Sequence, residues 1–355
     1  MHRTLCMAHK MKQLFCVAGF FAIGAFLPHK VWSGDYLYVT NTEVNLVSII
    51  DAENGLVIKE VPVGMAPADI VIDRQKRRIA ISHAGRLGEV WILELTTFTV
   101  EHRVLLIEEK EGRGTGDFSL AFTEDGKRLY AVNENSGLLY MIDAVEGKVI
   151  KEIRLVEKAG QITGMILAPD GRHLYISDNR EGKIYVVDTL RDAVVDTIRI
   201  YIRSRYAKVD TSSDTDATGR PMALSISPDG KTLYVTNTRN LSLDIIELST
   251  KKLIKQVPAG TQPTGVVITG DLRFLFVTNK LSYSVTMIDM ESKEAVANIP
   301  VGAFPIGIAI SPDGGKVYVC NYNESTVSII DVAKRQEVAR VATPVTPTKI
   351  AIYSP

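Results

Sequence analysis

The chain has 355 residues, 46% of them hydrophobic, and its 41 Lys and Arg residues balance 41 Asp and Glu residues. This composition is typical of a globular protein that is long enough to bury a large core. The charge balance excludes a strongly basic protein that covers nucleic acid with a broad phosphate-binding surface.

The first 33 residues differ from the rest and predict a secretory signal peptide. A basic start with Arg3, Lys10 and Lys12 precedes an apolar run from Leu14 to Leu27, and small residues suited to cleavage precede Gly34. The run is short for a membrane span, which needs about 20 residues. An uncleaved N-terminal anchor and a start at Met11 remain alternatives. Cleavage would leave 37 basic and 41 acidic groups in an exported chain.

Seven related segments follow, each of them a short strand with a polar end. They are YVTN at Tyr38, AISH at Ala80, YAVN at Tyr130, YISD at Tyr175, YVTN at Tyr234, FVTN at Phe276 and YVCN at Tyr318. Their spacings are 42, 50, 45, 59, 42 and 42 residues. A repeat of about 42 residues with four strands is typical of propeller blades.

Each repeat predicts four antiparallel strands. A short apolar strand follows a Pro or Gly, as in PTGVVIT from Pro263, and a turn such as SPDG at Ser227 leads into the segment that repeats. Asp-Gly favours this kind of turn because glycine accepts a positive φ. A third strand ends in an acid, as in VSIID at Asp331, and a more polar fourth strand closes the repeat.

The two ends of the chain predict how the ring closes. The first repeat lacks its leading apolar strand, and PTKIAIYSP from Pro347 supplies one and then stops. We therefore expect an all-β, seven-bladed β-propeller over residues 34–355, with one blade built from both terminal strands. Closure of this kind protects strand edges that otherwise favour aggregation.

The repeats resemble those of the YVTN-repeat β-propeller family over about residues 36–355. The resemblance implies the propeller fold, but it says little about function, because propellers bind, scaffold or catalyse. We interpret the repeated segment as structural, with its aromatic and Val packed between sheets and its Asn forming a turn. The alternative is a polar ring around one mouth of the channel, formed by Asn41, His83, Asn133, Asp178, Asn237, Asn279 and Asn321.

Two connections are longer than the repeat requires, namely residues 105–117 and 201–221. Both join the last strand of one blade to the first strand of the next, so both are expected at one mouth of the ring. The second loop mixes aromatic and cationic side chains, which are enriched at protein interfaces. The predicted partner-binding residues are Tyr201, Arg203, Arg205, Tyr206 and Lys208, with Arg113 from the first loop. A solvated loop without a partner is the alternative.

Sites for metals or catalysis are sparse in this sequence. Asp210, Asp214 and Asp216 form a weak calcium candidate, because their spacing fits no standard loop. His83, His102 and His173 are expected to be turn or surface residues, and Cys320 to be inert. Asp69 and Asp117 lie near the starts of inner strands, as acids do in lactonase-type propellers, but two acids do not define a site. We expect no catalytic residue and no cofactor on this chain.

The exported propeller without a catalytic set predicts a partner-binding subunit of an extracytoplasmic redox complex. The whole chain also resembles the propeller β subunits of anammox hydrazine synthases. That resemblance implies haem-carrying partner subunits, with haem c on those partners, that make hydrazine from nitric oxide and ammonium in the periplasm or the anammoxosome lumen. One alternative is a stand-alone binding module for a cell-envelope polymer, a peptide or DNA. Another is an enzyme of lactonase or amine-dehydrogenase type.

Overall fold

The computed structural model describes residues 34–84, 88–106, 116–156, 160–201 and 218–355. In these ranges the chain forms 28 strands and one short 3-10 turn, η1 (Thr42–Val44). None of the helical structure described there is long and apolar enough to cross a membrane. The segment expected to be a signal peptide, residues 1–33, lies outside the described residues.

The strands form seven sheets of four antiparallel strands, which are the seven blades expected from the repeats. Blade 1 contains β28 (Pro347–Tyr353), β1 (Tyr36–Asn41), β2 (Leu46–Asp51) and β3 (Leu56–Pro62). Blade 2 contains β4 (Pro67–Asp73), β5 (Arg78–His83), β6 (Glu89–Glu94) and β7 (Val100–Leu105). Blade 3 contains β8 (Phe118–Phe122), β9 (Arg128–Asn133), β10 (Leu138–Asp143) and β11 (Lys148–Arg154). Blade 4 contains β12 (Ile162–Leu167), β13 (His173–Asp178), β14 (Lys183–Asp188) and β15 (Ala193–Arg199).

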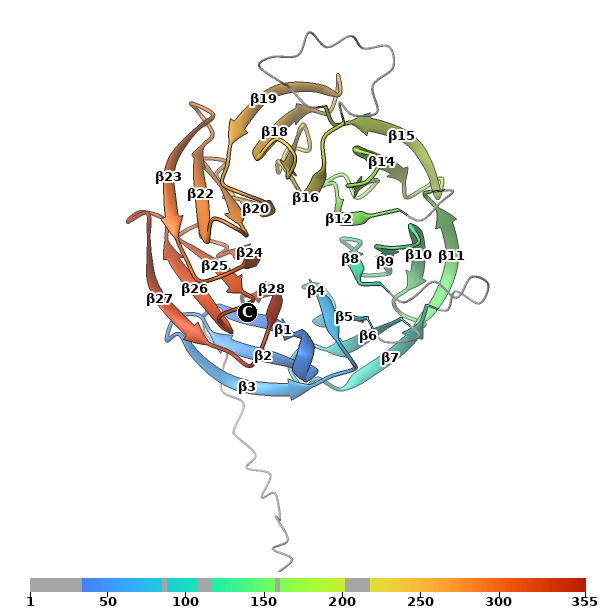
Figure 1. Ribbon diagram of the computed structural model, residues 1–355. Coiled ribbons are helices and arrows are strands. Elements are labelled where there is room, and N and C mark those ends of the chain that lie inside the picture. Colours follow the sequence, from blue (N-terminus) through green and yellow to red (C-terminus); the bar gives the residue numbers. More distant parts are fainter. Residues whose placement is uncertain (1–33, 85–87, 107–115, 157–159, 202–217) are drawn as a thin grey trace, which may run out of the picture. The chain divides into compact units, whose positions relative to one another are not determined.

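Blades 5 to 7 follow the same order. Blade 5 contains β16 (Pro221–Ile226), β17 (Thr232–Asn237), β18 (Ser242–Glu247) and β19 (Lys252–Pro258). Blade 6 contains β20 (Pro263–Ile268), β21 (Phe274–Asn279), β22 (Ser284–Asp289) and β23 (Glu294–Pro300). Blade 7 contains β24 (Pro305–Ile310), β25 (Lys316–Asn321), β26 (Thr326–Asp331) and β27 (Gln336–Ala342). The first strand of every blade contacts the first strand of the next in one unbroken cycle, so the blades form a closed ring (Figure 1).

Local sequence explains the turns that hold each blade. Between the first and second strands of blade 5, Ser227 Oγ donates to Asp229 Oδ1, and Gly230 adopts a φ of 68°. Between the third and fourth strands of blade 3, Asp143 Oδ1 accepts the backbone N–H groups of Val145 and Glu146. A carboxylate that bonds the backbone two and three residues ahead favours a turn.

The core lies between blades. The aromatic side chain of a repeated strand packs against the next blade, as Tyr130 of blade 3 does beside Leu174 and Ile176 of blade 4. Tyr130 and both of these partners are excluded from solvent. Aromatic side chains that are buried in this way contribute about 1.5–3 kcal/mol each. The aromatic and Val of the motif therefore have the packing role that the sequence predicted.

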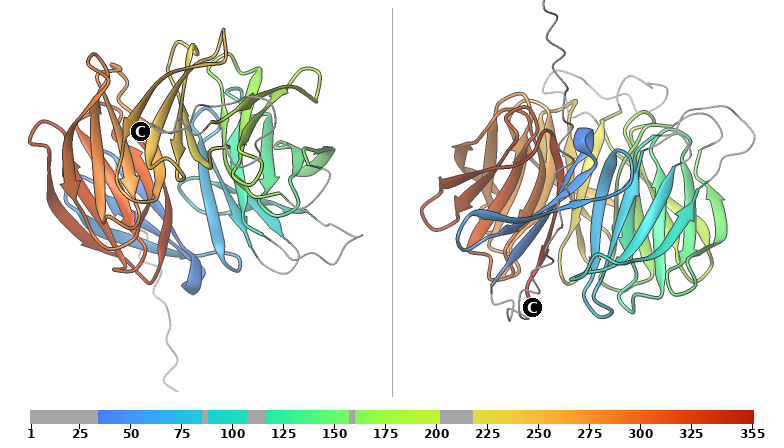
Figure 2. Two further views of the ribbon diagram at one scale, coloured as in Figure 1. Left: turned by 45° about the horizontal axis from the view of Figure 1, so that its top comes forward. Right: turned by 90° about the horizontal axis from the view of Figure 1, so that it is seen from below.

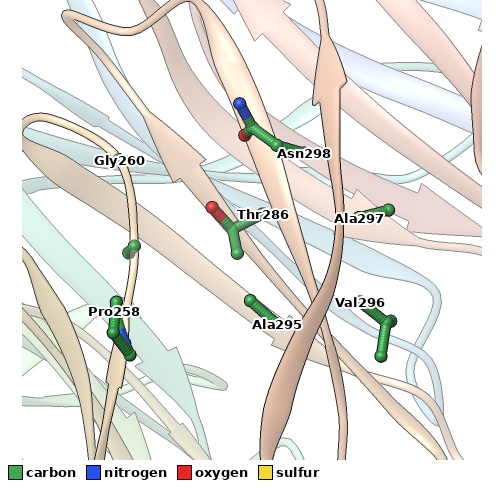
Figure 3. Close-up of a pocket in the computed structure, with 8 residues that line it drawn as sticks. Pro258, Gly260, Thr286, Ala295, Val296, Ala297 and Asn298 are labelled. Atoms are coloured by element: carbon green, nitrogen blue, oxygen red, sulfur yellow. The ribbon is translucent and has the colours of Figure 1, made fainter.

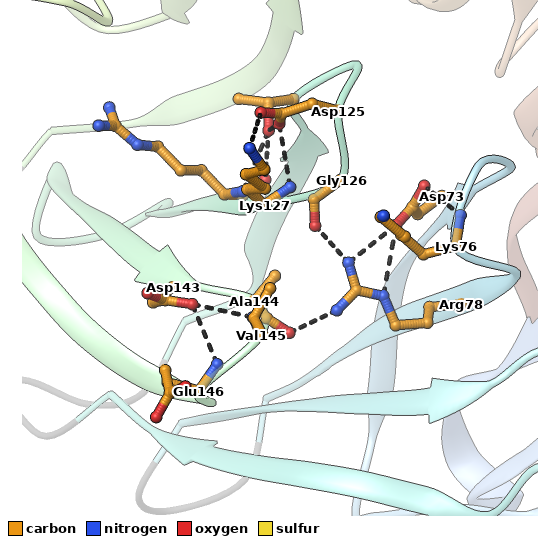
Figure 4. Close-up of polar contacts among 12 residues, drawn as sticks. Asp73, Lys76, Arg78, Asp125, Gly126, Lys127, Asp143, Ala144, Val145 and Glu146 are labelled. Carbon is orange, nitrogen blue, oxygen red and sulfur yellow. Dashed lines mark hydrogen bonds and ion pairs between the residues drawn. The ribbon is translucent and has the colours of Figure 1, made fainter.

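Blade 2 lacks the aromatic side chain and contacts blade 3 through an arginine instead. It has Ala80 where six blades have an aromatic, and Arg78, two residues earlier on the same face of β5, reaches into blade 3 (Figure 4). The Arg78 guanidinium donates to the Ala144 carbonyl at 2.5 Å and to the Gly126 carbonyl, while it forms an ion pair with Asp73 at 2.8 Å. Arg78 therefore links the turns of two blades through buried polar contacts.

Both ends of the chain share blade 1. The innermost strand β28 pairs antiparallel with β1, and Tyr36 lies opposite Tyr353. The described residues from Gly34 onward form one compact unit. The pairing of the terminal strands closes the ring in the way that the sequence predicted.

The ring has two different faces (Figure 2). The loops that follow the second strand of each blade, such as Thr42–Val44, lie on the same face as the connections between blades. We call this the long-loop face, because the described ends of the two long connections, Leu106 and Gly116 and then Tyr201 and Thr218, lie on it. The opposite turn face carries the loops between first and second strands and between third and fourth strands.

Candidate functional site at the long-loop face

The polar residue that ends each repeated strand is buried rather than exposed around the channel mouth. Asn41, His83, Asp178, Asn237, Asn279 and Asn321 have no solvent-exposed surface, and Asn133 is 4% exposed. Asn133 Oδ1 accepts the N–H groups of Asn135 at 3.0 Å and Ser136 at 2.8 Å. Asp178 and Asn237 accept equivalent pairs of N–H groups, so the turn-forming role is confirmed in blades 3 to 5, and burial contradicts the alternative of a polar ring at the channel mouth.

In four blades the Asn that ends the repeated strand also donates a hydrogen bond to the third strand, at the residue seven positions later. Asn41 donates to Ser48 Oγ at 2.9 Å, Asn279 to Thr286 Oγ1 at 2.9 Å and Asn321 to Ser328 Oγ at 2.7 Å. In blade 5 the acceptor is a carboxylate, because Asn237 donates to Asp244 Oδ2 at 2.9 Å. These bonds satisfy the amide nitrogens of buried side chains, which would otherwise destabilise the fold.

The expectation that His83 is a turn or surface residue is wrong. Its side chain has no solvent-exposed surface and its ring lies 4.9 Å from that of Trp91. Burial lowers the pKa of His83 to about 4, and the nearby charge of Arg103 acts in the same direction. The sequence reasoning failed because it did not place the end of the strand inside the interface between blades.

The inner strands make the channel asymmetric. The third residue of the first strand is glycine in blades 4, 6 and 7, and a Cβ on Gly164 would lie 2.7 Å from the Met222 carbonyl oxygen of the next blade. Blades 1 and 2 have Lys349 and Asp69 at this position. Strand β8 of blade 3 also lacks the register shift that interrupts the first strand of the other blades. On the inner strands, charged side chains therefore replace glycine in blades 1 and 2.

Asp69 joins two blades. Its backbone N–H donates to Ser82 Oγ at 2.9 Å, and its carboxylate Oδ2 accepts the N–H of Leu120 in the next blade at 2.8 Å. Ser82 Oγ in turn donates to the carbonyl of Phe118 at 2.8 Å. Asp69 thus has a structural role at the channel wall in addition to its charge.

Two further acids lie near Asp69. Burial raises the pKa of Glu134 to about 7, and the charge of Asp117 and that of Asp69 raise it as well, whereas Lys349 opposes them. Desolvation also raises the pKa of Asp117, although Asp117 is exposed to solvent. Carboxylates with raised pKa values that face one lysine are typical of sites that bind ligands or exchange protons, and of structural charge clusters.

The sequence pointed to only two of these four groups. It identified Asp69 and Asp117 but missed Glu134 and Lys349. The available signals were the position of Glu134 directly after the repeated Asn133, and a lysine on β28 where three inner strands have glycine. Within the described residues, no group of three or more His, Cys, Asp or Glu side chains is arranged to hold a metal ion.

The base of the second long loop is firmly attached to the ring. Tyr201 and Thr218 form an isolated β-bridge, and Asn240 Nδ2 donates to the Tyr201 carbonyl at 3.3 Å. Arg239 donates to the Thr218 carbonyl at 3.2 Å. Tyr201 is 52% exposed, as a partner-binding side chain would be. The other predicted residues lie outside the described residues: Arg203, Arg205, Tyr206, Lys208, Arg113 and the calcium candidates Asp210, Asp214 and Asp216.

The other two histidines and the cysteine named from the sequence lie away from the long-loop face or inside the core. His173 Nδ1 lies 2.5 Å from Asp170 Oδ2 at a turn, and His102 is half-buried on the outer strand β7. Cys320 lies within β25 and is fully buried, and burial raises the pKa of its thiol. A neutral buried thiol is unreactive, which agrees with the expectation from the sequence.

Comparisons with known proteins return the same fold with several activities. A family model described as the seven-bladed β-propeller of lactonases matches residues 94–253, and one described as the cytochrome D1 haem domain matches residues 229–349. No curated protein matches the sequence.

Three solved structures illustrate the likeness. The chain is 21% identical to a chain of Kuenenia stuttgartiensis hydrazine synthase, with a TM-score of 0.65 over 81% of this chain and 95% of that one. It is 14% identical to a protein of unknown function from Desulfotomaculum acetoxidans, with a TM-score of 0.70 over 90% and 99%. It is 15% identical to the dihydro-haem d1 dehydrogenase NirN in complex with DHE, with a TM-score of 0.62 over 87% and 64%. These likenesses identify the chain as a seven-bladed β-propeller.

Proposed function

We propose that this chain is a non-catalytic propeller subunit that binds haem-carrying proteins in an exported redox complex. The observation that supports it most is the likeness to a hydrazine synthase chain, because it spans 95% of that chain. The cytochrome D1 and NirN likenesses add two haem-associated propellers. In this proposal the chain resembles a hydrazine synthase β subunit, and the haem c groups and the chemistry belong to its partners.

The long-loop face is the proposed docking surface. Tyr201 is half-exposed and Arg239 donates to Thr218, the bridge partner of Tyr201, while Lys280 lies 5.3 Å from the ring of Phe304 on the same face. Aromatic and cationic side chains dominate the binding energy of protein interfaces. The bonds from Arg239 and Asn240 fix the base of the loop, which reduces the entropy lost on binding.

Native purification tests this proposal. The chain would be followed through gel filtration from its source organism while absorbance is read at the haem Soret band. Co-elution with haem at a mass well above one chain is the expected result. A colourless monomer would overturn the proposal and favour a stand-alone binding module.

A variant with Arg203, Arg205 and Tyr206 all replaced by Ala tests the docking surface. It should weaken assembly by about 2–4 kcal/mol, the scale of interface hot spots, and leave the melting temperature of the free propeller unchanged. Leu190→Ala on the turn face is the matched control, because Leu190 is 75% exposed. Equal assembly by both variants would place the interface elsewhere.

A lactonase-type enzyme is the second candidate. It is favoured by the family match over residues 94–253 and by the acids Asp69, Asp117 and Glu134 near the channel. Metal-dependent lactone hydrolysis by the isolated chain would support this candidate over the first.

A further inference from the structure

Two aromatic residues lie next to each other on the long-loop face of blades 6 and 7. Tyr283 belongs to the loop before β22, and Phe304 belongs to the connection before β24. Their ring centroids lie 5.9 Å apart, and Lys280 Nζ lies 5.3 Å from the centroid of the Phe304 ring. Tyr283 is 45% exposed, and Phe304 and Lys280 are half-buried, so all three are accessible. We call these three side chains the aromatic platform.

Both aromatics occupy backbone positions that favour glycine. The φ angle is 50° at Tyr283 and 56° at Phe304, in the left-handed region that costs free energy for a bulky side chain. The residue before the third strand has a positive φ in every blade, and the other six blades have Asn45, Gly88, Gly137, Gly182, Leu241 and Ser325 there. The residue before the first strand has a positive φ in three further blades, at Ala66, Gln262 and Thr346. Strain that the fold does not require is typical of functional sites.

Backbone hydrogen bonds fix the two loops that carry the rings. The Val301 N–H donates to the Tyr283 carbonyl at 3.0 Å, and the Tyr322 N–H donates to the Phe304 carbonyl at 3.0 Å. Loops that are held in this way lose little conformational entropy when a partner binds. The platform is therefore preorganised for an interface.

On the side of blade 5, the loop that carries Tyr283 borders a groove without charged lining residues (Figure 3). The groove lies between the end of β19 and the strands β22 and β23, has a volume of about 410 Å³ and is lined by small residues such as Thr286 and Val296. The Thr261 N–H donates to Ser282 Oγ at 2.7 Å and joins the loop to this blade boundary. The loop thus has a neutral groove on one side and the cationic, aromatic platform on the other.

Lys280 is the charged member of the platform, and it lacks an acidic partner. No acid among the described residues forms an ion pair with it. Glu324, in the loop before β26, pairs instead with Arg340 at 2.6 Å. A partner that covers the platform would remove water from the Lys280 ammonium group, and this is unfavourable unless the partner supplies an opposite charge. Binding therefore favours a carboxylate opposite Lys280.

We propose that the aromatic platform docks an acidic and apolar segment of a partner protein. An apolar side chain of this segment covers the rings of Tyr283 and Phe304, and a carboxylate pairs with Lys280. Tyrosine is among the residues that contribute most to binding at interfaces, and the cation–π contact keeps the ammonium group beside the rings. That the partner carries haem rests on the proposed function, whereas the chemistry of the docked segment does not.

Fluorescence anisotropy on the full propeller tests this chemistry with three labelled octapeptides that have blocked ends. The first alternates Asp and Phe, the second alternates Lys and Phe, and the third alternates Asp and Ser. Saturable binding of the Asp-Phe peptide, with both other peptides at least about tenfold weaker (about 1.4 kcal/mol), is the expected result. Absence of saturable binding, or a second peptide that binds as tightly as the first, would overturn the proposal.

Glycine variants assign the binding to the platform, because glycine accepts the positive φ and removes the ring. Tyr283→Gly and Phe304→Gly should each weaken binding of the Asp-Phe peptide by at least about tenfold, and the charge reversal Lys280→Glu should do the same. Leu272→Gly is the matched control on the turn face, since Leu272 has a φ of 61° and is 37% exposed. It should bind the peptide like the parent chain.

Val296→Asp tests the neutral groove on the other side of the loop, and it should also bind the peptide like the parent chain. Binding that Val296→Asp weakens, or that survives both ring variants when their circular dichroism spectra are native, would overturn the proposal. The native purification gives a separate answer. A colourless monomer that binds the Asp-Phe peptide would overturn the proposed function alone, and haem co-elution without peptide binding would overturn this inference alone.

Discussion

His83 shows how the position of one residue in the fold sets its chemistry. It ends a repeated strand, where four blades have Asn bonded to a small polar or acidic side chain, and it packs instead against Trp91. Gly64 makes this possible, because a Cβ there would lie 2.8 Å from His83 Cδ2. Protonation would place a charge in this closed interface between blades.

The stability of the propeller should therefore fall in acid through His83. Its pKa is about 4 in the folded chain and 6.5 when unperturbed, so below pH 6.5 the unfolded chain binds a proton that the folded chain does not. The loss begins near pH 6.5, is complete near pH 4, and amounts to about 3 kcal/mol. His83→Asn should flatten the dependence of the unfolding free energy on pH in this window. Denaturant titrations from pH 4 to 8 measure it, and equal slopes for both proteins would refute the assignment.

Single-residue environments were the part of the structure that the sequence predicted least well. The turn-forming roles of Asn133 and Asp143 could be predicted because they depend on residues two and three positions away. The burial of His83, and the proximity of Glu134 to Asp117, Asp69 and Lys349, depend on contacts between strands of different blades. Such contacts are fixed only when the ring is assembled.

At the scale of strands and turns, Arg78 forms a buried polar link between blades 2 and 3. The side chains of Arg78 and Asp73 are 7% and 2% exposed, and the guanidinium also bonds two carbonyl groups of blade 3. The blade 4 pair of Arg172 and Asp188 has a similar distance of 2.8 Å, but the Arg172 side chain is 44% exposed. The two pairs thus differ in the burial of the cation, and Asp188 has a second cation, Arg191, at 3.9 Å.

Arg78→Met should destabilise the propeller by about 3 kcal/mol, because it leaves the buried Asp73 without its cation. Arg172→Met is the control and should cost much less, since the Arg191 side chain at 3.9 Å and the backbone N–H groups of Leu190 and Arg191 still contact Asp188. Thermal or chemical unfolding of the two variants measures the difference. Similar losses would mean that burial of the arginine does not set the strength of the link.

At the scale of the whole molecule, closure of the ring depends on the last strand. Deletion of residues 347–355 removes β28 and exposes the edge of β1, as well as the sides of β4 and β24 that contact β28. Exposed strand edges pair with other chains. We expect the truncated chain to melt at a lower temperature and to form larger species in light scattering. Deletion of only Pro355, which follows β28 and leaves the hydrogen bond from Ser354 Oγ to Asp35 Oδ1 intact, should change neither property.

The architecture itself could be predicted almost completely from the sequence. Seven repeats, four of them with Asp-Gly turns, predicted the number of blades, and the missing first strand near Tyr36 predicted the pairing with Pro347–Tyr353. The buried carboxylate of Asp244 was not predicted, although an acid replaces the Ser or Thr of blades 1, 6 and 7 at the third position of that strand. Its hydrogen-bond donors Asn237, Ser242 and Gln256 come from three strands of blade 5, so its environment is fixed only when that blade forms.

The antiparallel register of β1 with β28 also determines how the molecule can be held. Because Tyr36 lies opposite Tyr353, the C-terminus leaves the ring on the turn face, at the opposite end of blade 1 from Thr42–Val44 (Figure 2). An affinity tag joined after Pro355 would thus attach the propeller to a sensor chip by its turn face. The surface proposed to receive haem proteins would point into the flowing solution, unobstructed by the support.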